Sequence, residues 1–363
     1  MTRRFLGSQP FKGRGALSNP PVRFESTLVE KVDDGWYAQE EQVGSVPETV
    51  LPDHAKSVIT TNDSPDVGFE QSINPYRGCS HGCVYCFARP THAYLGLSPG
   101  LDFETKLFYK DNAVELLRAE LGKRSYVCKP IALGINTDGW QPLERRLQVS
   151  RAVLEVLTEC RHPVTIVTKS ALVVRDLDLL QALARDQLVS VMVSITSLDN
   201  EIKRTLEPRT ASPQARLKVI EQLAAAGVPV GVLVAPVIPA LTDHEMEHIL
   251  EAAKAAGANS AGYVLLRLPH EIKDLFREWL AEHYPDRAKH VMSLINQARG
   301  GKDYQAEFGT RMVGTGVFAQ LLRARFAVAK RKYGFEDAEH RHELRTDLFR
   351  PPASNKAQMT LGF

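Results

Sequence analysis

The stretch NPYRGCSHGCVYCFARPTHAY, residues 74–94, places three cysteines within eight positions. Cys79, Cys83 and Cys86 follow the pattern Cys-x3-Cys-x2-Cys, and Tyr85 stands directly before the third cysteine. A structural zinc site has four protein ligands, and an ordinary [4Fe-4S] cluster has four thiolates. Three thiolates from one loop can hold three irons of a cubane cluster and leave the fourth iron open to a chelating molecule. We therefore interpret the stretch as a cluster loop whose missing ligand is a cofactor.

Two alternatives to this interpretation stay open. A zinc ion held by the three cysteines with His81 or His92 is the first, although neither histidine stands at a usual zinc-finger interval. Inert cysteines that are adjacent by chance are the second. Gly78 and Gly82 count against it, because a tight ligand loop needs such residues between its ligands.

After this loop, short apolar runs alternate with amphipathic segments. This alternation predicts parallel strands that are buried on both faces and connected by helices. The predicted strands are 71–78, 130–138, 163–170, 188–197, 229–238 and 261–269, and the predicted helices are 112–121, 145–160, 174–185, 213–226, 243–256 and 270–283. Six such units predict an α/β fold of the partial (β/α)6 barrel type. Its chemistry is expected at the C-terminal ends of the strands, where the segments 136–138, 168–170, 194–196, 236–239 and 267–269 lie.

Composition divides the chain into three regions. Residues 1–64 are rich in Gly, Pro and Arg and are predicted to be an irregular arm that is laid on the surface or partly disordered. Residues 65–302 are the predicted core domain. Residues 303–363 hold a predicted basic helix at about 315–333 and a polar, proline-broken tail. Residues 1–24 and 308–335 carry Lys or Arg and no acid. Solvated faces are the ordinary explanation for such runs, and nucleic-acid contact is the alternative.

The overall composition is that of a globular protein of 363 residues with a net charge of +2, which implies no global electrostatic partner. Five cysteines, three of them too close together for a set of bridges, indicate a reducing compartment. Cys128 and Cys160 are interpreted as small buried residues. The basic N-terminus lacks the apolar segment of a signal peptide, and no apolar run approaches the roughly 20 residues of a membrane span. These features predict a cytoplasmic protein without a membrane partner.

The cysteine motif at the start of a βα series resembles the radical S-adenosylmethionine (radical SAM) superfamily. The motif INPYRGC-HGC-YCFAR, followed by TD-QP-E and VTKS, is similar to the branch of that superfamily that contains spore photoproduct lyase, and the whole chain looks like a bacterial family within that branch. The resemblance implies a [4Fe-4S] cluster on Cys79, Cys83 and Cys86, with S-adenosylmethionine on the open iron. It also implies reductive cleavage of S-adenosylmethionine to a 5′-deoxyadenosyl radical, with a flavodoxin- or ferredoxin-type reductant as partner.

The same resemblance implies roles for five further residues. Tyr85 matches the aromatic residue near the adenine. Thr137 and Asp138 match the polar pair near the methionyl amino group, and a hydroxyl and a carboxylate are suitable acceptors for an ammonium. Lys169 matches the basic residue for the methionyl carboxylate. Ser194 ends the next strand, where a hydroxyl can bond the ribose.

The substrate is less closely defined by the resemblance. Spore photoproduct lyase has a hydrogen-donating cysteine just before the Thr/Ser-Asp pair, whereas Ile135 and Asn136 stand there in this chain, so thymine-dimer repair is not implied. Nucleic acid is the expected substrate class, because of the branch and the two basic terminal regions. The alternatives are radical modification of a protein or a small molecule, and a non-catalytic iron–sulfur or zinc protein.

The last six residues, Gln358–Phe363, resemble the short peptides that bind bacterial sliding clamps, in which an aliphatic and an aromatic side chain fill an apolar pocket. A sliding clamp is therefore a hypothetical partner. In the alternative, Leu361 and Phe363 dock on the protein's own barrel.

Overall fold

Seven strands form the central sheet of the computed structural model, which describes residues 11–24, 46–335 and 343–353. Their order is β10-β9-β8-β7-β6-β3-β2, and all neighbouring pairs are parallel except the antiparallel pair β2–β3. The six parallel strands confirm the predicted α/β fold of the partial barrel type. The bounds are β2 Ile59–Thr61, β3 Gln71–Ile73, β6 Ile131–Leu133, β7 Val164–Thr168, β8 Val189–Ser194, β9 Val230–Val237 and β10 Ser260–Leu265.

The inner strands are apolar on both faces. β8 reads VSVMVS and β9 reads VGVLVAPV, and most of their side chains are buried. Val, Ile and Leu fill the space on both sides, as expected where a parallel sheet is covered on both faces. Gly231 of β9 lies where an added Cβ would overlap Ser260 and Met192, so its missing side chain lets β8, β9 and β10 approach closely.

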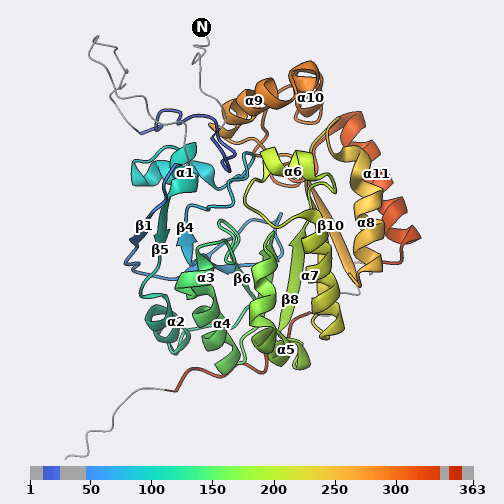
Figure 1. Ribbon diagram of the computed structural model, residues 1–363. Helices are drawn as coiled ribbons and strands as arrows, with labels where there is room; N and C mark the ends of the chain where they lie inside the picture. Colours follow the sequence, from blue (N-terminus) through green and yellow to red (C-terminus); the bar gives the residue numbers. More distant parts are fainter. Residues whose placement is uncertain (1–10, 25–45, 336–342, 354–363) are drawn as a thin grey trace, which may run out of the picture.

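Helices connect the parallel strands. In Figure 1, α4, α5 and α7 form one layer over the sheet, while α1, α6 and α9 lie at the end of the molecule where the parallel strands finish. The helix bounds are α1 Leu101–Thr105, α2 Ala113–Leu121, α3 Glu144–Leu147, α4 Val149–Glu159, α5 Leu177–Arg185, α6 Asn200–Leu206, α7 Pro213–Ala225, α8 Met246–Ala255, α9 Ile272–His283, α10 Pro285–Gln297 and α11 Gly316–Lys332. Short 3-10 helices are η1 Arg89–Leu95, η2 Ala171–Asp176 and η3 Asp243–Glu245.

The helix predicted over 145–160 is two helices. Gln148 separates α3 from α4 with a left-handed φ of 52°. The Glu144 carboxylate accepts hydrogen bonds from Ser150 N at 3.0 Å and Arg151 N at 3.1 Å. These bonds satisfy amide groups that the first turn of α4 would otherwise leave unpaired, so the helix starts again at this point.

The region before residue 65 contains two strands in addition to loops. β1 Thr49–Pro52 pairs in parallel with β5 Lys106–Tyr109, and β4 Tyr76–Arg77 completes this small sheet. β2 belongs to the central sheet itself, whereas the sequence predicts an irregular arm there. The domain boundaries at 64 and 302 stay a prediction. The structure nonetheless joins residues across each of them, because β2 pairs with β3 and Leu265 N donates to the Met312 carbonyl at 2.8 Å.

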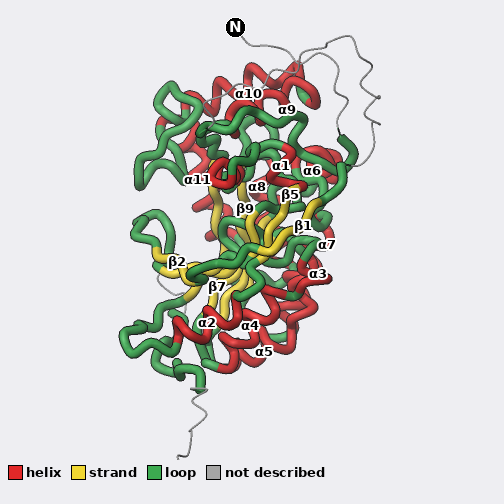
Figure 2. Tube along the Cα trace, turned by 90° about the vertical axis from the view of Figure 1, so that its left-hand side faces the viewer, coloured by secondary structure: helices red, strands yellow, loops and turns green. Residues whose placement is uncertain are grey.

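Figure 2 shows α3, α4, α5 and α7 on one side of the strands, with β2 on the opposite side. None of the helices in the described ranges combines the length and the apolar character that crossing a bilayer requires. The segment 343–353 is described, and its Arg350 N donates to the Cys160 carbonyl at 2.8 Å. The clamp-like motif Gln358–Phe363 lies outside the described residues.

Candidate active site

The three motif cysteines lie in the loop between β4 and η1. Gly82 N donates to the Cys79 carbonyl at 3.3 Å, and Cys86 N donates to the Cys83 carbonyl at 3.2 Å, so the loop makes successive tight turns. Gly78 and Gly82 have φ values of 74° and 70°, in the left-handed region that glycine tolerates best. The turns bring all three thiols to the wall of one pocket.

This pocket has a volume of about 580 Å³ and lies at the C-terminal ends of the parallel strands. Ligand pockets commonly measure roughly 300–1,000 Å³, so the space is sufficient for a cofactor of nucleoside size together with part of a substrate. Its wall combines the cysteine loop with residues from the strand ends, the β2–β3 hairpin and a segment beyond α10. Named by region in that order, the lining includes Cys79, Cys83 and Cys86; Asp138, Lys169, Ser194 and Arg267; Thr60, Asn62 and Phe69; and Arg311 and Met312.

The side chains fit a cluster better than a single metal ion. Within the described part of the chain, no three or more His, Cys, Asp or Glu side chains are grouped so that they could hold one ion. Of the two histidines named for a zinc site, His92 lies outside the pocket wall, and its Nε2 is 2.9 Å from the Lys106 carbonyl. His81 does line the pocket, and its Nδ1 lies 3.5 Å from Asp138 Oδ2. In a cubane each thiolate binds a different iron, so three thiols that share a wall without meeting at one point are suitable ligands.

Burial affects the ionisation of the thiols. It raises the pKa of Cys79 well above its usual range, and the nearby Asp138 carboxylate acts in the same direction. Burial likewise raises the pKa of Cys83 to about 12 and that of Cys86 above its usual value. The thiols are therefore neutral in the chain without a cluster. Metal binding there requires thiolates and releases protons.

A buried carboxylate supports the cysteine loop from behind. Glu104 accepts hydrogen bonds from Gly15 N at 3.0 Å, Ala16 N at 2.8 Å and Arg89 Nη2 at 2.5 Å. An added Cβ at Gly82 would lie 2.7 Å from Glu104 Oε2, so the carboxylate touches the loop directly. Residues 15–16 are thus packed between Glu104 and the cysteine loop, far from their place in the sequence.

Gly15→Ala is expected to destabilise the protein by about 1–3 kcal/mol, the usual cost of forcing an extra methyl group into a packed site. A Cβ at Gly15 would overlap the Gly82 carbonyl oxygen, which belongs to the rigid backbone of the cysteine loop. Urea unfolding measures the free energy, and loss of visible absorption in air measures exposure of a reconstituted cluster. Gly68→Ala is the matched control, because no atom lies within 4 Å of its Cβ position. Equal behaviour of the two variants would contradict the packing argument.

Tyr85 is held by a buried ion pair. Its hydroxyl donates to the Glu207 carboxylate, which also pairs with Arg216 and accepts from Thr196 Oγ1 at 2.6 Å. Burial acts to raise the pKa of Glu207, but the charges of Arg216 and Lys169 outweigh it and lower this pKa to about 2. Glu207 is therefore an anion that orients the Tyr85 ring on the pocket wall. The sequence offered no signal for Glu207, because its partners come from three other segments.

The structure separates the predicted pair Thr137 and Asp138. Asp138 lines the pocket, and its Oδ2 accepts from Lys169 N at 2.7 Å and from Thr168 Oγ1 at 3.0 Å. Thr137 is buried outside the pocket wall, and its hydroxyl donates to the Tyr76 carbonyl at 3.0 Å. Asp138 thus joins the ends of β6 and β7, whereas Thr137 anchors β4.

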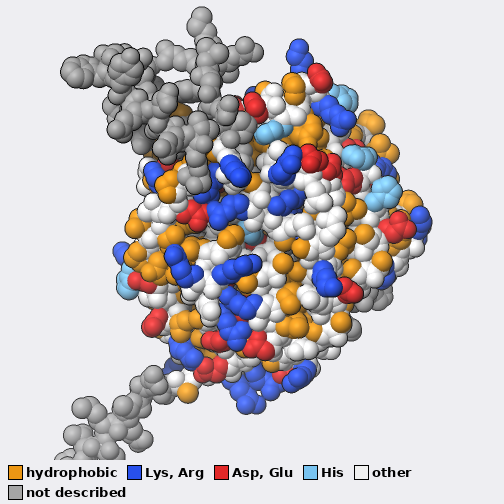
Figure 3. Space-filling view, viewed as in Figure 1, with side chains coloured by type: hydrophobic (Ala, Val, Ile, Leu, Met, Phe, Trp, Pro, Cys, Tyr) orange, Lys and Arg blue, Asp and Glu red, His pale blue; other side chains and the backbone are white. Residues whose placement is uncertain are grey.

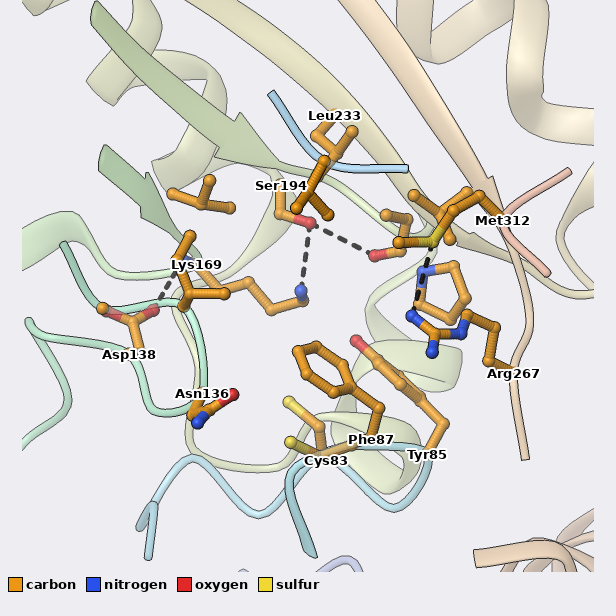
Figure 4. Close-up of a pocket in the computed structure, with 18 of the residues that line it drawn as sticks. Cys83, Tyr85, Phe87, Asn136, Asp138, Lys169, Ser194, Leu233, Arg267 and Met312 are labelled. Atoms are coloured by element: carbon orange, nitrogen blue, oxygen red, sulfur yellow. Dashed lines mark hydrogen bonds between the residues drawn. The ribbon is translucent and has the colours of Figure 1, made fainter. Parts of the chain in front are cut away.

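Lys169 and Ser194 meet inside the pocket, as Figure 4 shows. Lys169 Nζ donates to Ser194 Oγ at 3.0 Å and lies 5.8 Å from the centre of the Tyr85 ring. Ser194 Oγ in turn donates to the Ala235 carbonyl at 3.2 Å. Within the described residues Lys169 forms no ion pair with a carboxylate, so its ammonium is available to an anionic group of a ligand.

Two segments from opposite ends of the sheet close the pocket on one side. Arg311, from beyond α10, pairs with Asp66 of the β2–β3 hairpin at 2.5 Å, and Gly309 N donates to the same carboxylate at 2.6 Å. Sequence reasoning missed these residues as parts of the site. Arg311 and Asp66 are 245 positions apart, so no local pattern could have paired them.

Comparison with known proteins agrees with this geometry. A family model described as the radical SAM superfamily matches residues 73–253. An uncharacterized protein of Mycobacterium tuberculosis is 40% identical over 231 residues, which are 63% of this chain and 68% of that relative. An uncharacterized protein of Methanocaldococcus jannaschii is 26% identical over 232 residues, which are 64% of this chain and 82% of the relative.

A solved structure of spore photoproduct lyase, complexed with dinucleoside spore photoproduct, is also similar. The TM-score is 0.56 at 17% sequence identity, and the match covers 79% of this chain and 80% of the other. At this identity the likeness concerns the fold.

Proposed function

The chain belongs to the radical SAM superfamily, and on that premise we propose that its pocket binds a [4Fe-4S] cluster and S-adenosylmethionine to modify a nucleic acid by radical chemistry. Enzymes of this superfamily need a one-electron reductant, and we propose a flavodoxin- or ferredoxin-type protein in a reducing, cytoplasmic setting. The observation that carries the proposal is the pocket that brings three thiols, the Lys169 ammonium and the Ser194 hydroxyl together at the strand ends.

In this proposal each residue of the pocket has a limited task. Cys79, Cys83 and Cys86 hold the cluster. When bound, the cluster supplies the electron that cleaves S-adenosylmethionine and yields the 5′-deoxyadenosyl radical that takes a hydrogen atom from the substrate. The Lys169 ammonium binds the methionyl carboxylate. Ser194 positions the Lys169 ammonium and forms a hydrogen bond to the ribose.

Tyr85 and Asp138 act next to these groups. The Tyr85 ring is an apolar wall for the adenine, held in place by the Glu207 anion. Asp138 keeps the backbone of Lys169 in place and offers an acceptor for the methionyl ammonium. Thr137 supports this arrangement from behind, through its bond to the Tyr76 carbonyl.

Nucleic acid as the substrate class is supported by the charge of the pocket. The described residues of its wall include the carboxylate Asp138 and three cations. Arg311 is paired with Asp66, whereas Lys169 and Arg267 have no carboxylate partner among the described residues. The outer face seen in Figure 3 shows Lys and Arg side chains interspersed with Asp and Glu. The similar solved protein, spore photoproduct lyase, is complexed with dinucleoside spore photoproduct.

Repair of a thymine dimer is not part of the proposal. Ile135 and Asn136 line the pocket, and the sequence resemblance puts them in the place of the hydrogen-donating cysteine of spore photoproduct lyase. Among the described wall residues, the thiols are those of the three motif cysteines alone. A reaction that needs a fourth thiol as hydrogen donor therefore has no donor in this part of the wall.

Lys169→Met is expected to retain the cluster and to weaken S-adenosylmethionine binding about 10- to 100-fold, because one charge-assisted contact is lost. Equilibrium dialysis of the anaerobically reconstituted protein measures the affinity. Lys218→Met, an exposed lysine of α7, is the control and should bind like the wild type. Unchanged affinity in Lys169→Met would remove Lys169 from the cofactor site.

The enzymatic function itself is tested by reducing the reconstituted protein in the presence of S-adenosylmethionine and then measuring the 5′-deoxyadenosine that is formed. Electron paramagnetic resonance of the reduced cluster, with and without S-adenosylmethionine, is the second readout. A spectrum that does not change and an absence of 5′-deoxyadenosine would instead support a structural cluster.

A further inference from the structure

We propose that Arg267 binds a phosphate group of the substrate, on the side of the pocket away from Lys169. The inference rests on the proposed function, since it names the residue that recognises a nucleotide unit. Figure 4 shows Lys169 and Arg267 on opposite sides of the pocket, with Tyr85 and Phe87 between them. If Lys169 is used by the cofactor, Arg267 is left for a second ligand.

Among the described residues, the Arg267 guanidinium has no carboxylate counterion. Nη1 lies 3.4 Å from the Met312 sulfur, and Nη2 lies 3.4 Å from the Tyr304 hydroxyl. Nε is buried and has no hydrogen-bond partner in the described part of the chain. Both measured contacts are long and involve neutral acceptors. A guanidinium carries five donors arranged to bind an oxyanion in a bidentate manner, and most of that capacity is unused here.

A second buried cation lies close to Arg267. Arg299 is 1% exposed, and it donates to the backbone carbonyls of Leu265, Leu266, Thr310 and Arg311. Its Nε also lacks a partner within the described residues. Burial is the main cause that lowers the pKa of Arg299 to about 10, and repulsion by the charge of Arg267 adds to it. An anion at Arg267 relieves that repulsion.

The other cation on this side is already neutralised. Arg311 pairs with Asp66 and donates to Ser64, so it closes the wall while Arg267 faces the cavity. The Arg267 guanidinium lies 5.6 Å from the centre of the Phe87 ring, and Phe87 is 42% exposed. A phosphate on Arg267 would therefore place the attached nucleoside beside an exposed aromatic ring, a common surface for stacking bases.

The test compares Arg267→Gln with wild type, using the full chain with its cluster reconstituted. Fluorescence anisotropy measures the binding of a labelled single-stranded oligonucleotide at several salt concentrations. Arg267→Gln is expected to weaken binding at least about tenfold at low salt and to reduce the salt slope by about 1. Arg204→Gln is the control, because Arg204 is exposed on α6 and pairs only with Glu201 among the described acids. Inorganic phosphate is expected to displace the probe from wild type more strongly than chloride at equal ionic strength.

A thermal melt separates recognition from a structural role. Removing one of two repelling cations is expected to leave the melting temperature unchanged or higher, and inorganic phosphate should raise it in wild type but not in Arg267→Gln. Arg267→Lys keeps the positive charge but loses the planar guanidinium that can bind an oxyanion in a bidentate manner, so it is expected to bind the oligonucleotide with intermediate affinity.

Lower stability of Arg267→Gln together with unchanged oligonucleotide binding would overturn the inference, even if 5′-deoxyadenosine is still formed. Phosphate protection that depends on Arg267, without oligonucleotide binding, would uphold the anion site and reject nucleic acid as the substrate.

Discussion

Replacing any one of Cys79, Cys83 or Cys86 by Ala is expected to abolish the visible iron–sulfur absorption of the reconstituted protein. The remaining two thiolates cannot hold a cubane, and no other described cysteine lines the pocket. Iron content and absorption spectra after anaerobic reconstitution measure the loss. This is the largest effect we expect, because it removes the cofactor site completely.

Cys128→Ala and Cys160→Ala are the matched controls for this experiment. Cys160 is buried at the end of α4, where its carbonyl accepts from Arg350 N, and Cys128 is half-buried before β6. Both lie away from the pocket wall, so both variants should bind the same amount of iron as wild type. Loss of the cluster in Cys128→Ala would show that the ligand set differs from the three motif cysteines.

Glu207→Ala is expected to lower the free energy of unfolding by about 3–5 kcal/mol, because it leaves the Arg216 guanidinium buried without its counterion. Arg216 and Glu207 are both nearly inaccessible to solvent. Denaturant unfolding measures the change. Glu201→Ala removes an exposed i,i+3 partner of Arg204 and is expected to cost no more than about 0.5 kcal/mol. Equal costs for Glu207→Ala and Glu201→Ala would contradict the assigned role of the buried pair.

The pH dependence of stability gives an independent check on Glu207. Its folded-state pKa is lowered from 4.5 to about 2, so its stabilising effect is fully present above pH 4.5 and is lost as the pH falls toward 2. The linked free energy is about 3 kcal/mol. The stability difference between wild type and Glu207→Gln should therefore shrink across this acid range. A difference that stays constant would mean that Glu207 does not titrate with a lowered pKa.

The same buried pair connects stability with the site. Glu207 accepts from the Tyr85 hydroxyl, and Val84 N of the cysteine loop donates to the Leu206 carbonyl at 3.1 Å. The end of α6 therefore supports both the aromatic wall of the pocket and the loop that carries the thiols. We expect variants of Glu207 to release iron more readily than wild type at equal denaturant concentration.

Local patterns in the sequence were sufficient for the framework of the protein. The spacing of Cys79, Cys83 and Cys86 and the apolar runs of the six parallel strands are properties of neighbouring residues. Burial on both faces of a parallel sheet requires continuous apolar runs, so the strands can be recognised without knowing their partners. The polar residues that follow these runs, such as Lys169 and Ser194, meet in the pocket because parallel strands end at the same edge of the sheet.

Tertiary structure alone decided what surrounds that framework. β2 is three residues long, partly exposed and polar in composition, so only its pairing with β3 identifies it as a strand. The Glu104 contacts to Gly15 and Ala16 and the Asp66–Arg311 ion pair join residues about 90 to 245 positions apart. The rotation of Thr137 away from the pocket likewise depends on the position of the Tyr76 carbonyl. The spacing of apolar residues in the sequence indicates which side of a helix or strand is buried. It does not indicate which distant backbone group or side chain packs against that side, and the contacts named above depend on this.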